Sequence, residues 1–215
     1  TMAGYFNYED VWQIHSSLVK KFPQYVTQAR SFGKTWQNDD MLTFKIGNSI
    51  KTDGTSTKFG ILFNHLHHAR EQTTLTMLIM VLIENLRRIV QKDPMFNYIN
   101  IEFIPVVNVD SKRLIDKNWQ TPNWSQAKYL RKNRHSYGHC NNWQVGVDIN
   151  RNYGYKFGYN AKGGGSNDPC DEDYRGPKPF SEPETLAMKH FIEASPHIKS
   201  SMNFHAYGDL MIYPY

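Results

Sequence analysis

Phe63-Asn64-His65-Leu66-His67-His68-Ala69-Arg70-Glu71 joins a predicted strand to a predicted helix, and the rest of the chain is organised around it. Residues 59–63 are apolar apart from one glycine, which predicts a buried strand. From about Arg70 to Val90, apolar residues recur at helical spacing: Leu75, Leu78, Ile79, Leu82, Leu86 and Val90. The histidine-rich turn therefore lies at the carboxyl end of a strand, where α/β sheets place their sites.

Within this turn, His68 and Glu71 form an i, i+3 pair. Such a pair can direct an imidazole nitrogen and a carboxylate oxygen at one point, which suits zinc with bonds of roughly 2.0 to 2.2 Å. His205, in the strand-like segment 201–207, is the best third donor. Three protein ligands and a fourth position for water are typical of a catalytic zinc site. The alternative is an exposed His-Glu pair on a helix surface, because the motif alone is weak.

Composition predicts one soluble domain over residues 1–215, since 40% of the chain is hydrophobic and no linker or repeat interrupts it. The net charge is +5 and the sequence pI is about 9.1. The cations are scattered apart from residues 128–134, so we expect a solvated basic surface and no nucleic-acid partner. No apolar run is long enough to cross a bilayer, so we expect no membrane partner.

The two cysteines, Cys140 and Cys170, lie in loop-like sequence rich in Asn, Gly and Asp, where buried free thiols are not expected. A bridge between them would stabilise the fold by roughly 3 to 4 kcal/mol. Asn123-Trp124-Ser125 is a glycosylation sequon. Together these features favour a secreted protein, with two reduced thiols in a cytosolic protein as the alternative.

Elsewhere the pattern alternates helices and strands. We predict a helix over 8–22 that Pro23 stops, a strand over 41–46, and a strand over 100–107 that completes a strand-helix-strand crossover. Another helix is predicted over 181–194, followed by strands over 201–207 and 210–215. The fold class is therefore α/β.

Residues 108–173 lack regular periodicity, and loops of this length inside a domain are usually functional or disordered. Five anchors argue against disorder: Trp119, Trp124, Leu130, Trp143 and Val145. We therefore expect a structured excursion that contributes to the site. It contains Arg131, Asn150 and Arg151, and an arginine fork suits a clamp on a carboxylate, although most arginines form surface ion pairs.

Five motifs follow one another at defined spacing: His68-Ala69-Arg70-Glu71, Arg131-Lys132-Asn133-Arg134, Gly146-Val147-Asp148-Ile149-Asn150-Arg151-Asn152, Asn203-Phe204-His205-Ala206-Tyr207 and Ile212-Tyr213-Pro214-Tyr215. In this order the chain resembles the zinc metallocarboxypeptidases of the carboxypeptidase A and B type along its whole length. The resemblance implies a mixed, largely parallel twisted sheet flanked by helices. It also implies a hydrolase of the metalloprotease class.

The resemblance further implies a role for each matching residue. His68, Glu71 and His205 would bind one zinc ion, and Arg131 would stabilise the oxyanion of the tetrahedral intermediate. Asn150 and Arg151 would hold the substrate's terminal carboxylate, and Arg70 and Tyr207 would line further subsites. The carboxylate of Asp148 would accept the other ring N–H of His68. The resemblance also implies a Cys140–Cys170 disulfide and therefore an extracellular or secretory compartment.

The implied activity is hydrolysis of the C-terminal peptide bond of peptides or proteins, since an internal bond offers no carboxylate for Arg151 to bind. Zinc would lower the pKa of water and polarise the scissile carbonyl. The alternatives are a non-catalytic relative that binds peptide termini and a zinc amidohydrolase that removes an acyl group from an amino acid.

The family's general-base glutamate and its closing tyrosine have no counterpart, because the sequence stops ten residues after His205. We therefore expect the N-terminal portion of a catalytic domain, truncated at its C-terminal side, whose remainder was lost or lies on another chain. The alternatives are a shortened non-catalytic relative and an artificially shortened chain. The 215-residue polypeptide alone should bind about one zinc ion and hydrolyse peptides weakly or not at all.

Overall fold

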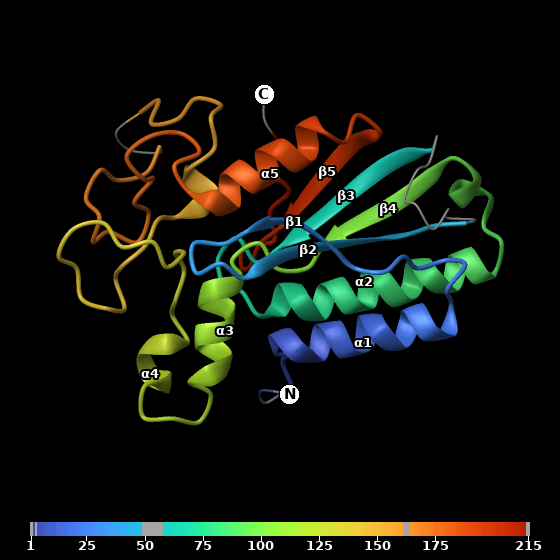
Figure 1. The fold of residues 1–215 in the computed structure, drawn as a ribbon, viewed down its shortest axis with the longest axis horizontal. Coiled ribbons are helices and arrows are strands. Elements are labelled where there is room, and N and C mark those ends of the chain that lie inside the picture. Colours follow the sequence, from blue (N-terminus) through green and yellow to red (C-terminus); the bar gives the residue numbers. More distant parts are fainter. Residues whose placement is uncertain (1, 3, 49–57, 161–163, 214–215) are drawn as a thin grey trace.

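The computed structural model describes residues 2, 4–48, 58–160 and 164–213. These residues form a five-stranded mixed sheet in the order β1-β2-β4-β3-β5, flanked by helices (Figure 1). The strands are β1 (Arg30–Lys34), β2 (Asp40–Ile46), β3 (Phe59–His65), β4 (Ile99–Ile104) and β5 (Ile198–Phe204). The helices are α1 (Tyr8–Lys21), α2 (Thr73–Val90), α3 (Val109–Lys117), α4 (Trp124–Ala127) and α5 (Pro183–Glu193), with short 3-10 turns η1 (Pro94–Asn97) and η2 (Ile149–Arg151).

Strand pairing determines where the site can form. β3 runs parallel to both β4 and β5, whereas β2 pairs antiparallel with β4 and with β1. The predicted crossover is present, because α2 connects β3 to β4. At the other side of β3, His65 pairs with Phe204. The carboxyl ends of β3 and β5 therefore leave the sheet side by side.

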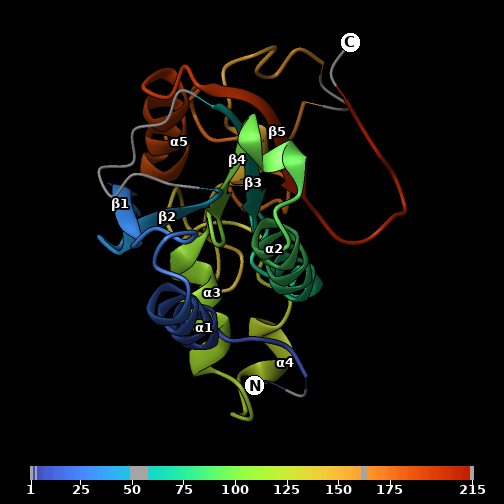
Figure 2. The ribbon, with the colours of Figure 1, turned by 90° about the vertical axis from the view of Figure 1, so that its right-hand side faces the viewer.

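Helices cover both faces of the sheet (Figure 2). On one face α1 and α2 pack against the strands, with Val19 and Leu82 in one buried cluster with Phe44 and Phe103. On the other face α5 packs on the sheet through a second cluster that contains Met188. Burying such a side chain contributes roughly 1.5 to 3 kcal/mol, so the sheet is fixed between two apolar layers.

Capping residues set the helix starts that periodicity alone left approximate. Asn7 accepts from the backbone N–H of Asp10, whose side chain accepts from the N–H of Asn7, so α1 begins at Tyr8. Pro183 in the first turn begins α5. Among the described helices, none has both the length and the apolar character to cross a bilayer.

Several boundaries differ from the prediction. α2 begins at Thr73 and not at Arg70, because residues 68–72 form tight turns in which the N–H of Glu71 bonds to the carbonyl of His68. β4 ends at Ile104, before the predicted limit at residue 107. β5, predicted over 201–207, begins three residues earlier at Ile198 and ends at Phe204, so His205 follows it directly.

Other elements were missed or wrongly predicted. β1 was not predicted, nor were α3, α4 and η2 within the excursion. The strand predicted over 210–215 is wrong for residues 210–213, which have no strand pairing and are exposed. Residues 214 and 215, which end the last motif, lie outside the described residues.

Candidate metal centre

Three donor groups meet where the parallel strands β3 and β5 end. His68 and Glu71 lie in the turns that follow β3, and His205 is the first residue after β5. One donor atom of each side chain lies within 4.8 Å of the others. The sheet register thus brings together side chains that are 137 positions apart in the sequence.

The donor distances fit one tetrahedral ion. The Nδ1 atom of His68 lies 2.7 Å from Oε1 of Glu71 and 3.2 Å from Nδ1 of His205. The Nδ1 atom of His205 lies 2.9 Å from Oε2 of Glu71. Zinc bonds of roughly 2.0 to 2.2 Å separate neighbouring tetrahedral ligands by about 3.3 Å, so small shifts of these side chains admit the ion. Two imidazoles and one carboxylate leave one position for water or substrate.

Asp148 connects the parts of this centre and is fully buried. Its Oδ1 atom lies 3.1 Å from Nε2 of His68 and accepts from the backbone N–H of Asn150 at 3.0 Å. Its Oδ2 atom accepts from Nε and Nη2 of Arg131 at 3.0 and 2.6 Å. In the tautomer that can bind a metal ion, Nε2 of His68 donates its proton to Asp148 and the Nδ1 lone pair is left for the ion. Without an ion, a protonated Nδ1 donates to Oε1 of Glu71. This one carboxylate therefore fixes the tautomer of His68, the position of the Arg131 guanidinium and the backbone turn at Asn150.

The charges at the centre suit a cation. Burial raises the pKa of Glu71, but hydrogen bonds to His205 and His68 outweigh burial and lower the pKa to about 2. Burial likewise raises the pKa of Asp148, and its contacts with His68 and Arg131 lower the pKa to about 2. Both carboxylates are therefore ionised at neutral pH. Burial lowers the pKa of His68, whereas hydrogen bonds to the two carboxylates raise it, with a net increase.

The three other predicted polar residues of the excursion lie around Asp148. Arg131 directs Nη1 to within 3.2 Å of Nδ1 of His68 while its other nitrogens bind Asp148. Asn150 and Arg151 belong to η2, the turn that Asp148 caps. The Nε atom of Arg151 is buried and donates no hydrogen bond to the described residues. An unpaired guanidinium nitrogen of this kind suits an anionic ligand.

The residues predicted to line outer subsites are not drawn into the centre. Arg70 donates from Nη1 to Glu172 at 2.8 Å and to the carbonyl of Tyr129 at 3.3 Å. Tyr207 is fully exposed, although it follows His205 by two residues. Both therefore lie outside the hydrogen-bond network of the three donors.

Two further histidines of the turn region, His67 and His65, had no role predicted from the sequence. The Nε2 atom of His67 lies 2.7 Å from the hydroxyl of Tyr153, and its ring centroid lies 5.9 Å from that of His205. Burial, reinforced by the nearby His205, lowers the pKa of His67 to about 3. His65 stacks on Phe204. The available signal was the run of three histidines within residues 65–68, of which only His68 has a glutamate at i+3.

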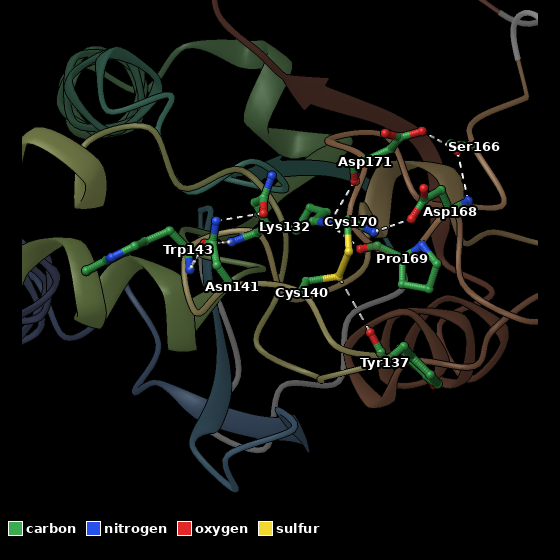
Figure 3. Close-up of a disulfide and its surroundings, with 11 residues drawn as sticks. Lys132, Tyr137, Cys140, Asn141, Trp143, Ser166, Asp168, Pro169, Cys170 and Asp171 are labelled. Carbon is green, nitrogen blue, oxygen red and sulfur yellow. Dashed lines mark hydrogen bonds between the residues drawn. A yellow bond between two sulfur atoms is a disulfide. The ribbon is translucent and has the colours of Figure 1, made fainter.

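A disulfide between Cys140 and Cys170 closes the excursion, and the chain has no free cysteine (Figure 3). Lys132, the residue after Arg131, is buried and donates from Nζ to the carbonyls of Pro169 and Asp171 at 2.8 and 2.7 Å. The predicted bridge is therefore present. It anchors the loop to which the Arg131 segment is attached.

Comparison with known proteins identifies the relatives of the chain. The model of the family Peptidase_M14, described as zinc carboxypeptidase, matches residues 12–215. Zinc carboxypeptidase A 1 of Drosophila melanogaster is 28% identical over 99% of this chain and 46% of its own length. Human mast cell carboxypeptidase A is 28% identical over 99% of this chain and 48% of its own length. The chain thus spans about half the length of these relatives.

Solved structures share the fold. Bovine thrombin-activatable fibrinolysis inhibitor, in complex with tick carboxypeptidase inhibitor, superposes with a TM-score of 0.78 at 24% identity, covering 98% of this chain and 64% of that chain. Carboxypeptidase A from Helicoverpa armigera superposes with a TM-score of 0.73 at 24% identity, covering 97% of this chain and 47% of that chain. The predicted mixed sheet flanked by helices is therefore confirmed.

Proposed function

This chain belongs to the zinc carboxypeptidase family, and on that premise we propose that its centre binds one zinc ion and serves hydrolysis of the C-terminal peptide bond of peptides and proteins. The observation that carries the proposal is the convergence of His68, Glu71 and His205 within 4.8 Å. Zinc at this position supplies a positive charge that polarises a carbonyl and activates water.

The chain's own residues divide the remaining tasks. Asp148 fixes the tautomer of His68 and holds Arg131. Arg131 then presents Nη1 beside the metal position, where negative charge develops on the scissile carbonyl. Asn150 and Arg151 hold the terminal carboxylate of the substrate, supported by the unpaired Nε of Arg151. Arg70 and Tyr207 contact residues further along the peptide.

Proton transfer from water needs a base, and within the part of the chain that the structure describes the hydrogen-bond network of the centre offers no further carboxylate. The carboxylates in contact with His68 are Glu71 and Asp148, and both already bind partners at the centre. We therefore expect the 215-residue polypeptide to bind zinc and to release C-terminal residues weakly or not at all. A protein that only binds peptide termini would need the carboxylate clamp of Asn150 and Arg151 but no general base.

The test is zinc binding by the native chain and by a variant that lacks one ligand. Equilibrium dialysis followed by elemental analysis should give about one zinc per native chain. Substituting Glu71→Gln, which removes the anionic ligand, should lower the affinity by more than about 100-fold. The matched control, Glu193→Gln at an exposed position of α5, should leave zinc binding unchanged. A native chain that binds no zinc would refute the proposal.

A second assay separates the candidate activities. The purified chain is incubated with a peptide and with N-acyl amino acids, and released C-terminal residue is measured beside released acetate or succinate. Release of the C-terminal residue, even at a low rate, supports a peptidase. Release of acid supports the amidohydrolase alternative.

We also infer an extracellular or secretory location for this chain. The Cys140–Cys170 disulfide supports an oxidising compartment. Asn123, the acceptor of the sequon, is exposed at the start of α4. Expression through a secretory pathway, followed by thiol titration and glycosidase treatment, tests this inference.

A further inference from the structure

The turns that carry His68 and Glu71 are held from outside the metal centre by α3, a helix that periodicity did not predict. α3 lies beside the N-terminal end of α2 (Figure 1). Asn108, the residue before its first turn, donates to the carbonyl of His67 at 3.2 Å. Lys112, four residues later, donates from Nζ to Oε1 of Gln72 at 2.5 Å. These two contacts flank the two proposed ligands on both sides in the sequence.

Gln72 transmits the second contact into the turn. Its Nε2 donates to the carbonyl of Ala69 at 2.5 Å while its Oε1 accepts from Lys112. Ala69 is fully buried between the ligands His68 and Glu71 in the sequence. The Gln72 amide therefore uses both of its ends to connect α3 to the peptide between the two ligands.

Lys112 is a fixed anchor for this connection. It is fully buried, and its ammonium donates to three acceptors: the carbonyl of Phe6 at 2.9 Å, Oε1 of Gln72 and Oδ1 of Asp116 at 2.7 Å. Asp116 in turn accepts from the backbone N–H of Tyr8 at 2.7 Å. Burial lowers the pKa of Lys112, and the carboxylate of Asp116 opposes that change. Because all three N–H donors of the ammonium are hydrogen-bonded, the side chain of Lys112 is held in one conformation.

We propose that Lys112 and Gln72 are positioning residues for the metal centre, which hold the 68–72 turns in the conformation that lets His68 and Glu71 bind one zinc ion. Neither residue touches the ion. The inference rests on the proposed zinc site and adds to it the part of the protein that preorganises two of its three ligands. Groups that orient metal ligands in this way typically change affinity by about 10- to 100-fold.

The main test is Gln72→Leu, which keeps the approximate size of the side chain and removes both of its hydrogen bonds. The control is Asn118→Leu at the end of α3, where a buried residue donates from its amide to the carbonyl of Leu114 at 2.8 Å; among the described residues its side chain forms no hydrogen bond with residues 68–72. Gln72→Leu loses two partly buried hydrogen bonds, to Ala69 and from Lys112, and Asn118→Leu loses two partly buried bonds, to Leu114 and from Thr121. Only Gln72→Leu breaks the connection to the ligand turn.

Two measurements are made on each 215-residue variant. Zinc affinity is measured by competition with a chromophoric chelator, and the visible spectrum of the Co²⁺-loaded protein reports ligand geometry at saturation. We expect Gln72→Leu to raise the zinc dissociation constant by about 10- to 100-fold and to alter the Co²⁺ spectrum. Asn118→Leu should keep the native zinc affinity and Co²⁺ spectrum, even if its unfolding midpoint falls as much as that of Gln72→Leu.

The outcomes separate this inference from the function on which it rests. Native zinc affinity and an unchanged Co²⁺ spectrum in Gln72→Leu would overturn the inference alone. Equal weakening in both variants would also overturn it, because the effect would then follow stability. A native chain that binds no zinc would overturn the proposed function and this inference together. If Gln72→Leu does not fold, Gln72→Ser, which leaves room for water beside Lys112, replaces it in the same comparison.

Discussion

Asp148 illustrates how one buried side chain can organise a centre. Its two oxygens receive four donors, from His68, from both Nε and Nη2 of Arg131, and from the N–H of Asn150. The donors come from three different segments of the chain. Through Asp148 the ring of His68, a proposed ligand, is joined to Arg131 and to Asn150 of the proposed substrate clamp. Removing its charge should therefore affect metal binding as well as stability.

We predict that Asp148→Asn weakens zinc binding by about 10- to 100-fold, because the amide no longer fixes His68 and leaves Arg131 without its counter-ion. Chelator competition measures the change. Asp168→Asn, at an exposed loop position whose carboxylate accepts from the backbone N–H of Cys170, serves as the control and should bind zinc normally. Equal affinities in the two variants would contradict the prediction.

Glu184 should make stability depend on pH without involving the metal. Its fully buried carboxyl has a pKa of about 7, since burial raises the pKa more than hydrogen bonds from Trp36 and Asn133 lower it. A raised carboxyl pKa means that the folded state keeps its proton while the unfolded state loses it. This group therefore lowers the free energy of unfolding as pH rises from about 4.5 to 7, by about 3 kcal/mol in total.

Urea unfolding at several pH values tests this expectation. In Glu184→Gln the pH-dependent loss between about 4.5 and 7 should disappear, so the difference in free energy of unfolding between this variant and the native chain should change across that range. Glu193→Gln, an exposed glutamate of the same helix, should keep the native profile. Parallel curves for the native chain and Glu184→Gln would show that Glu184 does not titrate in this range.

Sequence spacing located His68 and Glu71, the strand-like segment 201–207 offered His205 as the third donor, and the family resemblance supplied the roles of Asp148 and Arg131. The structure brings these five together, while their roles stay predictions. Lys112 and Gln72 could not be found in this way. Their contacts join segments 40 positions apart, and a lysine or glutamine in isolation is usually a surface residue.

At the scale of elements, the Cys140–Cys170 disulfide should stabilise the excursion. Its loop of 30 positions predicts a contribution of about 3 to 4 kcal/mol. The double variant Cys140→Ser, Cys170→Ser should show that loss in the free energy of unfolding by urea. Reductant should destabilise the native chain and leave the double variant unaffected. A reductant effect of equal size in both proteins would exclude the disulfide as its cause.

The packing of β1 on α5 should tolerate no added side chain at Gly33. A Cβ atom there would overlap with the Cβ atom of Ala187. Gly33→Ala should therefore destabilise the fold by about 1 to 3 kcal/mol. Ala187→Gly in the same chain should recover part of this loss, since the clash disappears. Strict additivity of the two changes in chemical denaturation would contradict direct contact.

The elements that the sequence predicted are those with regular apolar spacing, above all α1, α2 and β3. β1 was missed because five residues with exposed and half-buried positions form no alternating pattern. α3 was missed because polar residues occupy its buried face: Asp110, Ser111 and Lys112. A helix whose buried face consists of charged and polar side chains that hydrogen-bond to other segments cannot be recognised from hydrophobic periodicity.

At the scale of the whole molecule, zinc should act as a ligand of the folded state. Binding that requires the folded arrangement of His68, Glu71 and His205 adds about 4 kcal/mol to stability when free zinc is about 1,000 times its dissociation constant. Thermal unfolding should therefore shift upward with zinc in the native chain and far less in Glu71→Gln. The same upward shift in both proteins would mean that zinc binds elsewhere.

The fold class followed from the alternation of helices and strands along the chain. The order of strands in the sheet did not, because β5 joins β3 from the far end of the sequence and nothing local specifies its neighbour. The need for a third metal donor, and then the family resemblance, indicated that His205 and the turn after β3 belong together.

The pairing of the last described strand with β3 also has a consequence for synthesis of the chain. A nascent polypeptide carries two of the three donors soon after it leaves the ribosome, whereas the third follows 137 positions later. Until that segment emerges, the growing chain can hold metal only through His68 and Glu71. The proposed zinc site, with its three ligands, can therefore form only after translation has passed residue 205.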